Sequence, residues 1–276
     1  MMQRVWIMTV YFTKSLFFSL TGLIVLILSL IYWVVLFPPG QGTPDPENYI
    51  ILVGALGVAA TFLTALALTA RAARLENFPM LVRLPSRIEY LTAVLLSSLL
   101  LGLAMQALVA GLALIRGPEL TTARWLAIPP LWLSVNLLAA VLALHVSDLV
   151  TVGWSRVILF GVLAALLILR GVSSSPDSWL VERLYDLASF FGQFNFAWLS
   201  DAALGVASGL GSASMGAVSQ AAGIVFWPFT AMTDAVLAGG FTPSQALAPA
   251  VLMLYGSILF LIAATLFAGK DLEFSE

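Results

Sequence analysis

Residues 50–95, IILVGALGVAATFLTALALTARAARLENFPMLVRLPSRIEYLTAVL, decide the fold of this chain. The first part, residues 50–70, is an apolar run, and a second apolar run begins at Tyr90. Each run is long enough to cross a membrane, because about 20 apolar residues in a helix span the hydrocarbon core. A segment with four arginines lies between the two runs. This order predicts two membrane-spanning helices joined by a charged loop on one side of the membrane.

The composition of the whole chain also indicates a membrane protein. Of its 276 residues, 61% are hydrophobic and only 9% are charged, whereas about 25% are charged in a soluble domain. The formal net charge of −2 leaves no basic surface for nucleic acid, so we expect no nucleic-acid partner. The chain has no cysteine and one histidine, so neither a disulfide nor a metal site is expected.

Apolar runs along the chain predict an all-α integral membrane protein with a single transmembrane domain, residues 1–276. An amphipathic N-terminal helix is expected at residues 1–15. Six spans follow, at residues 16–37, 50–70, 90–115, 128–150, 154–172 and 246–268. The fifth span is the weakest, because two arginines close to its ends must extend to the headgroups. The last span follows Thr242-Pro243-Ser244-Gln245, where Thr242 and Gln245 predict a capping box.

The distribution of basic residues predicts the orientation of these spans. With six spans, eight basic residues lie on one side of the membrane: Arg4, Lys14, Arg71, Arg74, Arg83, Arg87, Arg156 and Lys270. Four lie on the other side: Arg116, Arg124, Arg170 and Arg183. The side with more positive charge faces the cytoplasm. We therefore expect a multi-pass protein of the cell membrane (plasma or inner membrane), with both termini in the cytoplasm.

The segment at residues 173–241 is too long for a simple connection and should contain helices of its own. An interfacial helix is expected after Ser175-Pro176, because an apolar stripe is formed by Leu180, Leu184, Leu187 and Phe191. A second, short helix should begin at residues 226–229 and end at Gly239-Gly240. We interpret the region as re-entrant or interfacial helices on the outer face. Residues 203–227 could instead form a seventh span.

The loop at residues 71–89 combines charged and apolar side chains. Its apolar members include Phe78 and Leu81, and its charged members are Arg71, Arg74, Glu76, Arg83, Arg87 and Glu89. This pattern predicts a short amphipathic helix interrupted at Pro79 and Pro85. Ser86, with Glu89 three residues later, predicts a capping box at the start of the next span. The arginines are either orientation signals on lipid phosphates or a docking surface for a cytoplasmic partner.

The order of these features resembles the membrane permease subunit of a type 2 ABC exporter. The resemblance lies in the N-terminal segment MMQRVWIMTVYFTKSL, the loop string FPMLVRLPSRIEYL and the tail LFAGKDLEF. It implies that residues 71–89 form a coupling helix, where separate cytoplasmic ABC ATPase subunits dock beside the N-terminal segment. A second permease copy or a paralogue would complete the translocation path in the membrane lipid. The partner ATPase would bind ATP and Mg, and this chain would bind no cofactor.

The chain offers little support for chemistry of its own. It lacks the GxxxxGK[ST] phosphate loop, so we expect no ATP hydrolysis and no enzyme activity from this chain. An intramembrane serine protease would depend on His145 as its base, but a histidine near a helix end more often interacts with the helix dipole. The alternative to a permease is a non-transporting membrane subunit that anchors a larger complex.

Three amides lie within or near the apolar runs: Gln106, Asn136 and Gln220. We expect them to form interhelical hydrogen bonds, which are the common role of amides inside a membrane. No acidic or basic residue lies in the middle of a predicted span. Transport coupled to protons or sodium usually requires such a residue, so movement driven from outside the membrane is favoured.

Overall fold

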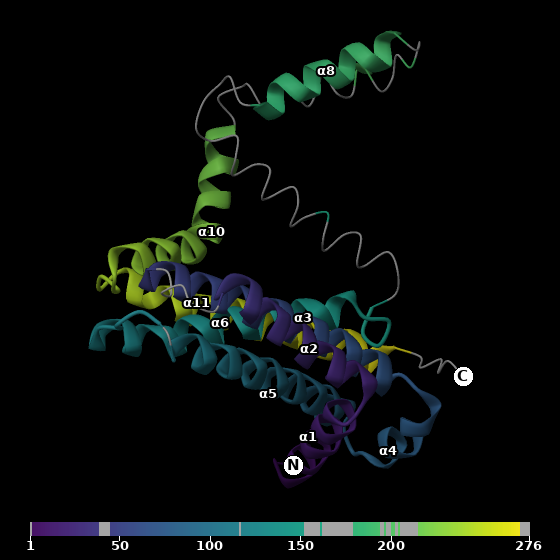
Figure 1. The fold of residues 1–276 in the computed structure, drawn as a ribbon. Coiled ribbons are helices and arrows are strands. Elements are labelled where there is room, and N and C mark those ends of the chain that lie inside the picture. Colours follow the sequence, from purple (N-terminus) through teal and green to yellow (C-terminus); the bar gives the residue numbers. More distant parts are fainter. Residues whose placement is uncertain are drawn as a thin grey trace. The chain divides into compact units, whose positions relative to one another are not determined.

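The computed structural model describes residues 2–38, 45–115, 117–151, 161, 179–193, 196, 200–201, 204 and 215–270. Every regular element in these ranges is a helix (Figure 1), which confirms the predicted all-α class for them. Four helices are long and apolar enough to cross a membrane: α3 (Pro46–Ala72), α5 (Arg87–Leu114), α6 (Thr122–Val146) and Gln245–Gly269, which ends in α11 (Ala248–Gly269). The protein is therefore embedded in a membrane. The predicted span at residues 154–172 lies outside the described ranges except for residue 161.

The N-terminal region folds into two helices, α1 (Met2–Phe17) and α2 (Leu20–Leu36), which meet at an angle of 70°. Ser19 caps α2, because its Oγ accepts a hydrogen bond of 3.3 Å from the backbone N–H of Gly22. The buried stripe of α1 is formed by Val5, Met8, Thr9, Phe12 and Leu16. The predicted amphipathic helix and the apolar helix after it are thus confirmed. The break between them lies at residues 18–19, slightly later than predicted.

The antiparallel pair of α3 and α5 makes the most extensive contact between helices in the described bundle. Glycines allow the two backbones to approach closely. A Cβ atom added to Gly102 of α5 would lie 2.7 Å from Thr61 Cα, and one added to Gly57 of α3 would overlap the Gln106 amide. The contact continues along the pair. At one end, the Tyr49 hydroxyl donates to the Ala110 carbonyl at 3.3 Å. We call this contact the α3–α5 seam.

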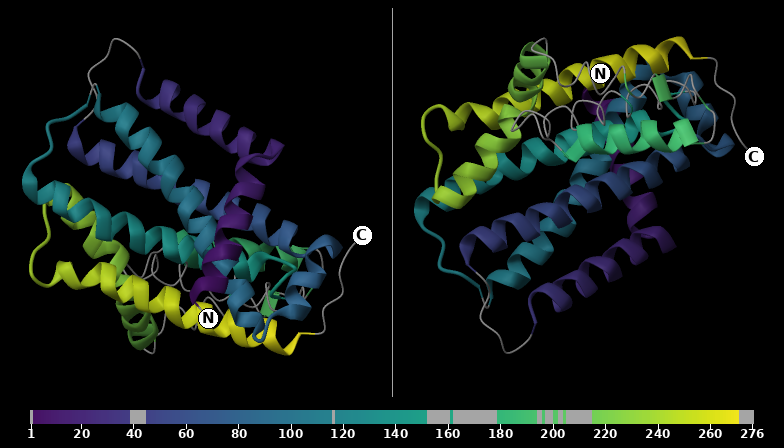
Figure 2. Two further views of the ribbon diagram at one scale, coloured as in Figure 1. Left: turned by 90° about the horizontal axis from the view of Figure 1, so that it is seen from below. Right: turned by 90° about the horizontal axis from the view of Figure 1, so that it is seen from above.

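The helices α6 and α11 lie side by side and run in the same direction, as Figures 1 and 2 show. Leu137 of α6 packs against Gly256 of α11, since a Cβ atom there would lie 3.1 Å from Leu137 Cγ. Nearer the ends of both helices, His145 Nε2 lies 2.9 Å from the Leu259 carbonyl oxygen. Both helices therefore end at the side of the bundle where α3 ends and α5 begins. We call this side the loop end.

The predicted start of α6 requires correction. The helix α6 begins at Thr122 rather than residue 128, so Pro129 and Pro130 lie inside the helix and not in its first turn. Thr121 takes the N-cap position there. By contrast, the capping box before α11 is confirmed. Thr242 N donates to Gln245 Oε1 at 3.0 Å, Gln245 N donates to Thr242 Oγ1 at 3.4 Å, and the 3₁₀ turn η2 (Gln245–Leu247) follows.

The region before α11 contains two helices, α8 (Trp179–Gln193) and α10 (Met215–Ala238). A helix, α8, is present where the interfacial helix is expected, and most side chains of its predicted stripe are not among those described. Its position at the membrane interface stays a prediction. The short helix predicted at residues 226–239 was wrong at its start, because α10 continues through Pro228 back to residue 215. Its predicted end is correct, since Gly239 has a φ of 81° that favours glycine.

The chain divides into two compact units: the bundle, which comprises Met1–Arg156 and Pro228–Glu276, and a second unit, Val157–Trp227. In the second unit, Ser200 Oγ donates to the Ala188 carbonyl at 2.9 Å, which joins the segment after α8 to that helix. The bundle contains the residues that the sequence singles out for function. The site is therefore built on the bundle.

We expect Gly102→Leu to destabilise the bundle, because the new side chain would separate α3 from α5. Overpacking of this kind costs about 1–3 kcal/mol. The matched control is Gly111→Leu on the same helix, since a Cβ atom at Gly111 meets nothing within 4 Å. Thermal unfolding of the purified protein in detergent would show a lower midpoint for Gly102→Leu only. Equal midpoints for the two variants would contradict the close packing at the α3–α5 seam.

Candidate functional site

The loop between α3 and α5 folds into the 3₁₀ turn η1 (Leu75–Asn77) and the helix α4 (Phe78–Arg83). Pro79 lies in the first turn of α4, where its missing N–H would have no helical partner in any case. Leu84, which precedes Pro85, has an extended backbone and ends the helix. The predicted amphipathic segment is therefore a 3₁₀ turn followed by a short helix. The change from η1 to α4 comes just before Pro79, and α4 ends directly before Leu84 and Pro85, close to the two predicted interruptions.

Side chains at the start of the loop fasten it to α1. Arg71 Nη1 donates to the backbone carbonyl of Ser15 and, at 2.9 Å, to the Ser15 hydroxyl. Asn77 is 3% exposed, and its Nδ2 donates to the Arg71 carbonyl at 2.9 Å. The Tyr11 hydroxyl of α1 lies 3.4 Å from Asn77 Oδ1. The arrangement holds α1, the end of α3 and η1 in one geometry.

Side chains at the end of the loop fasten it to the last helix. Arg87 Nη1 donates to the backbone carbonyls of Ala268, at 3.3 Å, and Lys270, at 2.8 Å. A cation at the end of α11 is favourable, because the carbonyls there lack helical partners. Lys270 Nζ in turn donates to the Asp148 carbonyl, which follows α6. The first residue of α5 is thus connected to the ends of α11 and α6.

Tyr90 joins four helices at the loop end. Its hydroxyl donates to the Ala72 carbonyl, the last residue of α3, at 2.8 Å. Its ring meets Phe12 of α1 edge-on at 5.4 Å and stacks on Phe267 of α11 at 6.4 Å. Each of the three rings is at most 1% exposed. Movement of α3 or α5 at this point must therefore displace α1 and α11 as well, since packed interiors have little free space.

The capping box predicted at Ser86 is present in part. Ser86 Oγ accepts a hydrogen bond of 3.3 Å from the backbone N–H of Ile88. Glu89 is only 4% exposed, and in the described part of the chain its Oε2 has no hydrogen-bond partner. Its position in the first turn of α5 is favourable for a negative charge. Glu89 therefore faces the protein rather than a partner.

The remaining loop residues differ in exposure. Arg74 and Glu76 lie 3.9 Å apart with side chains 61% and 65% exposed, so their ion pair contributes little. Arg83 is exposed as well, whereas Leu81 is 5% exposed and packs in the core of the bundle. The Phe78 side chain is not among those described. Of the eight predicted site residues, three lie on the surface: Arg74, Glu76 and Arg83. Four others bond to or pack against the rest of the chain: Arg71, Arg87, Leu81 and Glu89.

Asn77, Tyr11 and Ser15 were not among the predicted site residues. Asn77 directly precedes α4 in the N-cap position, which is the usual sequence signal for asparagine before a helix. In the structure its side chain makes no such cap and bonds to the Arg71 carbonyl instead. The N-cap position was the available signal, but the partners come from α1 and α3 and are not adjacent to Asn77 in the sequence.

Two of the predicted interhelical amides form a pair inside the bundle. Asn136 Nδ2 of α6 donates to Gln106 Oε1 of α5 at 2.6 Å, and Gln106 Nε2 donates to the Val53 carbonyl of α3 at 3.3 Å. Both side chains are at most 1% exposed. The prediction is confirmed for these residues, while the Gln220 side chain is not among those described. His145 is 3% exposed and bonded to a carbonyl of α11.

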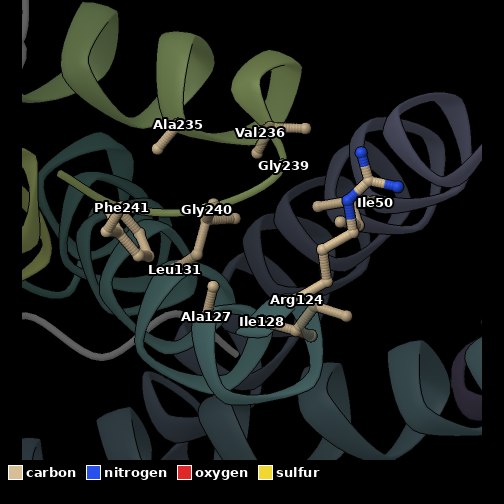
Figure 3. Close-up of a pocket in the computed structure, with 10 residues that line it drawn as sticks. All are labelled: Ile50, Arg124, Ala127, Ile128, Leu131, Ala235, Val236, Gly239, Gly240 and Phe241. Carbon is tan, nitrogen blue, oxygen red and sulfur yellow. The ribbon is translucent and has the colours of Figure 1, made fainter. Parts of the chain in front are cut away.

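The opposite end of the bundle holds an ion pair between Arg124 Nη2 of α6 and Glu47 Oε1 of α3, whose side chains are 15% and 25% exposed. Figure 3 shows Arg124 beside Ile50, at the rim of a small cavity near Gly239 and Gly240. The cavity has a volume of about 10 Å³, which is close to the minimum for one water. The ion pair joins the beginnings of α3 and α6. In the described ranges no group of three or more His, Cys, Asp or Glu residues could hold a metal ion.

Comparison with protein-family models, curated proteins and solved structures gave no significant match. The arrangement at the loop end must therefore be interpreted from its own chemistry. It consists of a short, partly exposed helix, α4, whose Leu81 packs in the core, between residues that bond to α1, α3 and α11.

We expect Arg71→Ala to loosen the loop from α1. The variant removes the side-chain donors to Ser15, so the Ser15 carbonyl loses a hydrogen-bond partner. Such a loss costs about 1–3 kcal/mol of folding stability. The control Arg74→Ala removes an exposed arginine and should change stability by less than about 0.5 kcal/mol. Thermal unfolding, together with the rate at which a glutamate-specific protease cuts after Glu76, measures both effects. Equal behaviour of the two variants would show that the contact with Ser15 does not hold the loop.

Proposed function

We propose that this chain is the transmembrane permease subunit of an ATP-driven exporter of the ABC type. It would form the translocation path in the cell membrane with a second copy or a paralogue, and separate cytoplasmic ATPase subunits would bind ATP and Mg. The observation that carries the proposal is the construction of the loop end. There exposed charged side chains lie on α4 and on the turn before it, and the flanking residues are bonded to α1, α3 and α11.

A helix that transmits force needs an exposed contact surface and stiff attachments. Arg74, Glu76 and Arg83 supply exposed charged groups, and Leu75 and Val82 add apolar surface that is 46% and 64% exposed. The attachments are the hydrogen bonds of Arg71 and Arg87, which do not depend on a partner. Closure of docked ATPases would then move α4 with the ends of four helices, as a rigid-body change. This division of roles supports a coupling helix over a simple orientation signal.

The direction of the helices supports six spans rather than seven. Because α6 and α11 are parallel, the chain leaves α6 at the loop end near Thr151 and enters α11 from the opposite end near Thr242. An odd number of crossings must connect those two points. The predicted fifth span at residues 154–172 would supply one crossing, and a further span at residues 203–227 would make the number even. With six spans and the loop end in the cytoplasm, both termini are cytoplasmic.

The distribution of charge within the long helices supports transport driven from outside the membrane. In α3, α5, α6 and α11, the Asp, Glu, Lys and Arg residues lie in the terminal turns: Glu47, Arg71, Arg87, Glu89 and Arg124. The polar groups at mid-helix are amides, which bond to other helices, and hydroxyls, most of which bond to carbonyls of their own helix. A proton relay or sodium site usually needs an ionisable group at that depth. An external ATPase needs none.

The decisive experiment is to purify the full chain from its native membrane in mild detergent and to identify its partners. We expect a stoichiometric ATPase subunit and vanadate-sensitive ATP hydrolysis. The double variant Arg74→Glu with Arg83→Glu should lower the copurified ATPase by about tenfold or more, because two charges at the contact change sign. The control Arg74→Lys with Arg83→Lys keeps the charge and should retain most of the ATPase.

Two outcomes would contradict the proposal. If the charge-reversed chain retained its ATPase, α4 would not be the docking surface. If the unmodified chain came out alone, or in a complex without an ATPase, the alternative of an anchoring membrane subunit would replace the permease. Membrane insertion and a monodisperse elution profile of each variant show that the fold has been kept.

A further inference from the structure

The bundle contains a second, larger cavity between α3, α6 and the part of α10 that follows Pro228. It is a groove of about 270 Å³. Its floor includes Gly54, Ala55 and Val58 of α3, and its walls include Trp132 of α6 with Phe229 and Met232 of α10. All of these side chains are apolar or small. Since α3 and α6 are long and apolar enough to span the membrane, we expect the groove to lie at the depth of the hydrocarbon.

The shape of the groove is maintained by a polar contact on one wall. Trp132 Nε1 donates to the Ile50 carbonyl of α3 at 3.2 Å, which fixes the indole between the two helices. A Cβ atom on Gly54 would lie 3.2 Å from the same nitrogen, so glycine leaves the space that the indole needs. Ala55 is exposed on the floor of the groove. The groove is thus a built feature of α3 and α6.

The volume limits what can occupy the groove. A site for a single water needs only about 10–15 Å³ of such volume, so the groove has room for an alkyl chain of many carbon atoms. One acyl chain therefore fits the groove.

The groove adjoins the cavity beside Arg124, because Ile50, Leu131 and Val236 line both. Figure 3 shows these three residues and Arg124 around the smaller cavity. A guanidinium has five N–H donors, and among the described residues the one hydrogen bond of this group is to Glu47 Oε1. Other donors remain for a phosphate, whose planar array of oxygens suits arginine. Trp125, 51% exposed in the first turn of α6, is typical of the level of the headgroups.

We propose that this groove binds one acyl chain of an anionic phospholipid, with the lipid phosphate at Arg124. The acyl chain comes from hydrocarbon, so burial alone supplies no preference for the site. Selectivity must come from the headgroup end, where Arg124 offers donors and positive charge. The inference requires only that the bundle lies in a membrane. It does not depend on the proposed transport function.

The test uses the full chain in phosphatidylcholine vesicles that contain a minor fraction of phosphatidylglycerol with brominated acyl chains. Bromine quenches tryptophan at short range, and the difference between the unmodified chain and Trp132→Phe isolates the signal of Trp132. We expect the brominated phosphatidylglycerol to quench Trp132 about fivefold more effectively than the same amount of brominated phosphatidylcholine, the ratio that one arginine near an anionic headgroup supplies.

Two matched pairs of variants make the outcome decisive. Ala55→Phe fills the groove and should remove the quenching of Trp132, while Ala59→Phe, one turn further on the same helix and also exposed, should leave it unchanged. Arg124→Gln should abolish the preference for phosphatidylglycerol, and Arg124→Lys should keep part of it. Equal quenching by the two lipids, or equal behaviour of the two alanine variants, would overturn the proposal. Should Ala55→Phe fail to fold, the arginine pair alone decides.

Discussion

The close approach of α3 and α5 is the contact on which the rest of the bundle depends. Inside a membrane, burial of apolar surface does not drive helices together, so they must associate through close packing and hydrogen bonds. Gly57 and Gly102 provide the packing, and the Gln106 amide, held against α3, also receives the Asn136 side chain of α6. One seam thus positions three helices. The same seam determines where the loop between α3 and α5 emerges, and therefore where α4 can be presented.

The loop end and the opposite end of the bundle are built in different ways. At the loop end, backbone carbonyls accept from arginine, tyrosine and lysine side chains, and aromatic rings fill the space between four helices. At the opposite end, one ion pair joins α3 to α6 beside small cavities. A stiff end with exposed charges suits a contact that transmits force. An end with open apolar space suits a ligand that enters from the bilayer.

Local patterns in the sequence were enough to predict the helices and several of their ends. The capping box at Thr242, the helix end at Gly239 and the apolar runs depend on neighbouring residues only, so they can be recognised without the fold. The start of α10 was missed because Pro228 was taken as the start of a helix, although a proline can lie within one when its neighbours compensate. The amides Gln106 and Asn136 were correctly expected to form interhelical hydrogen bonds, because few other partners exist at that depth; that they bond to one another could be seen only in the fold. No local signal distinguished Arg71 and Arg87, which bond to carbonyls of other parts of the chain, from Arg74 and Arg83, whose side chains are exposed in the loop. Their acceptors are carbonyls of α1 and α11, and the burial of Leu81 likewise depends on helices that are distant in the sequence.

The acceptors of Arg87 have a consequence for the order in which the protein is made. They lie 181 and 183 residues further along the chain, in and just after the last helix. When α5 is inserted, neither acceptor has been synthesised, and the stacking partner of Tyr90, Phe267, is also missing. During that interval the arginine side chain can act on lipid headgroups as an orientation signal. Only after α11 arrives can the side chain bond to these carbonyls, so the contact that joins the start of α5 to the end of α11 forms last.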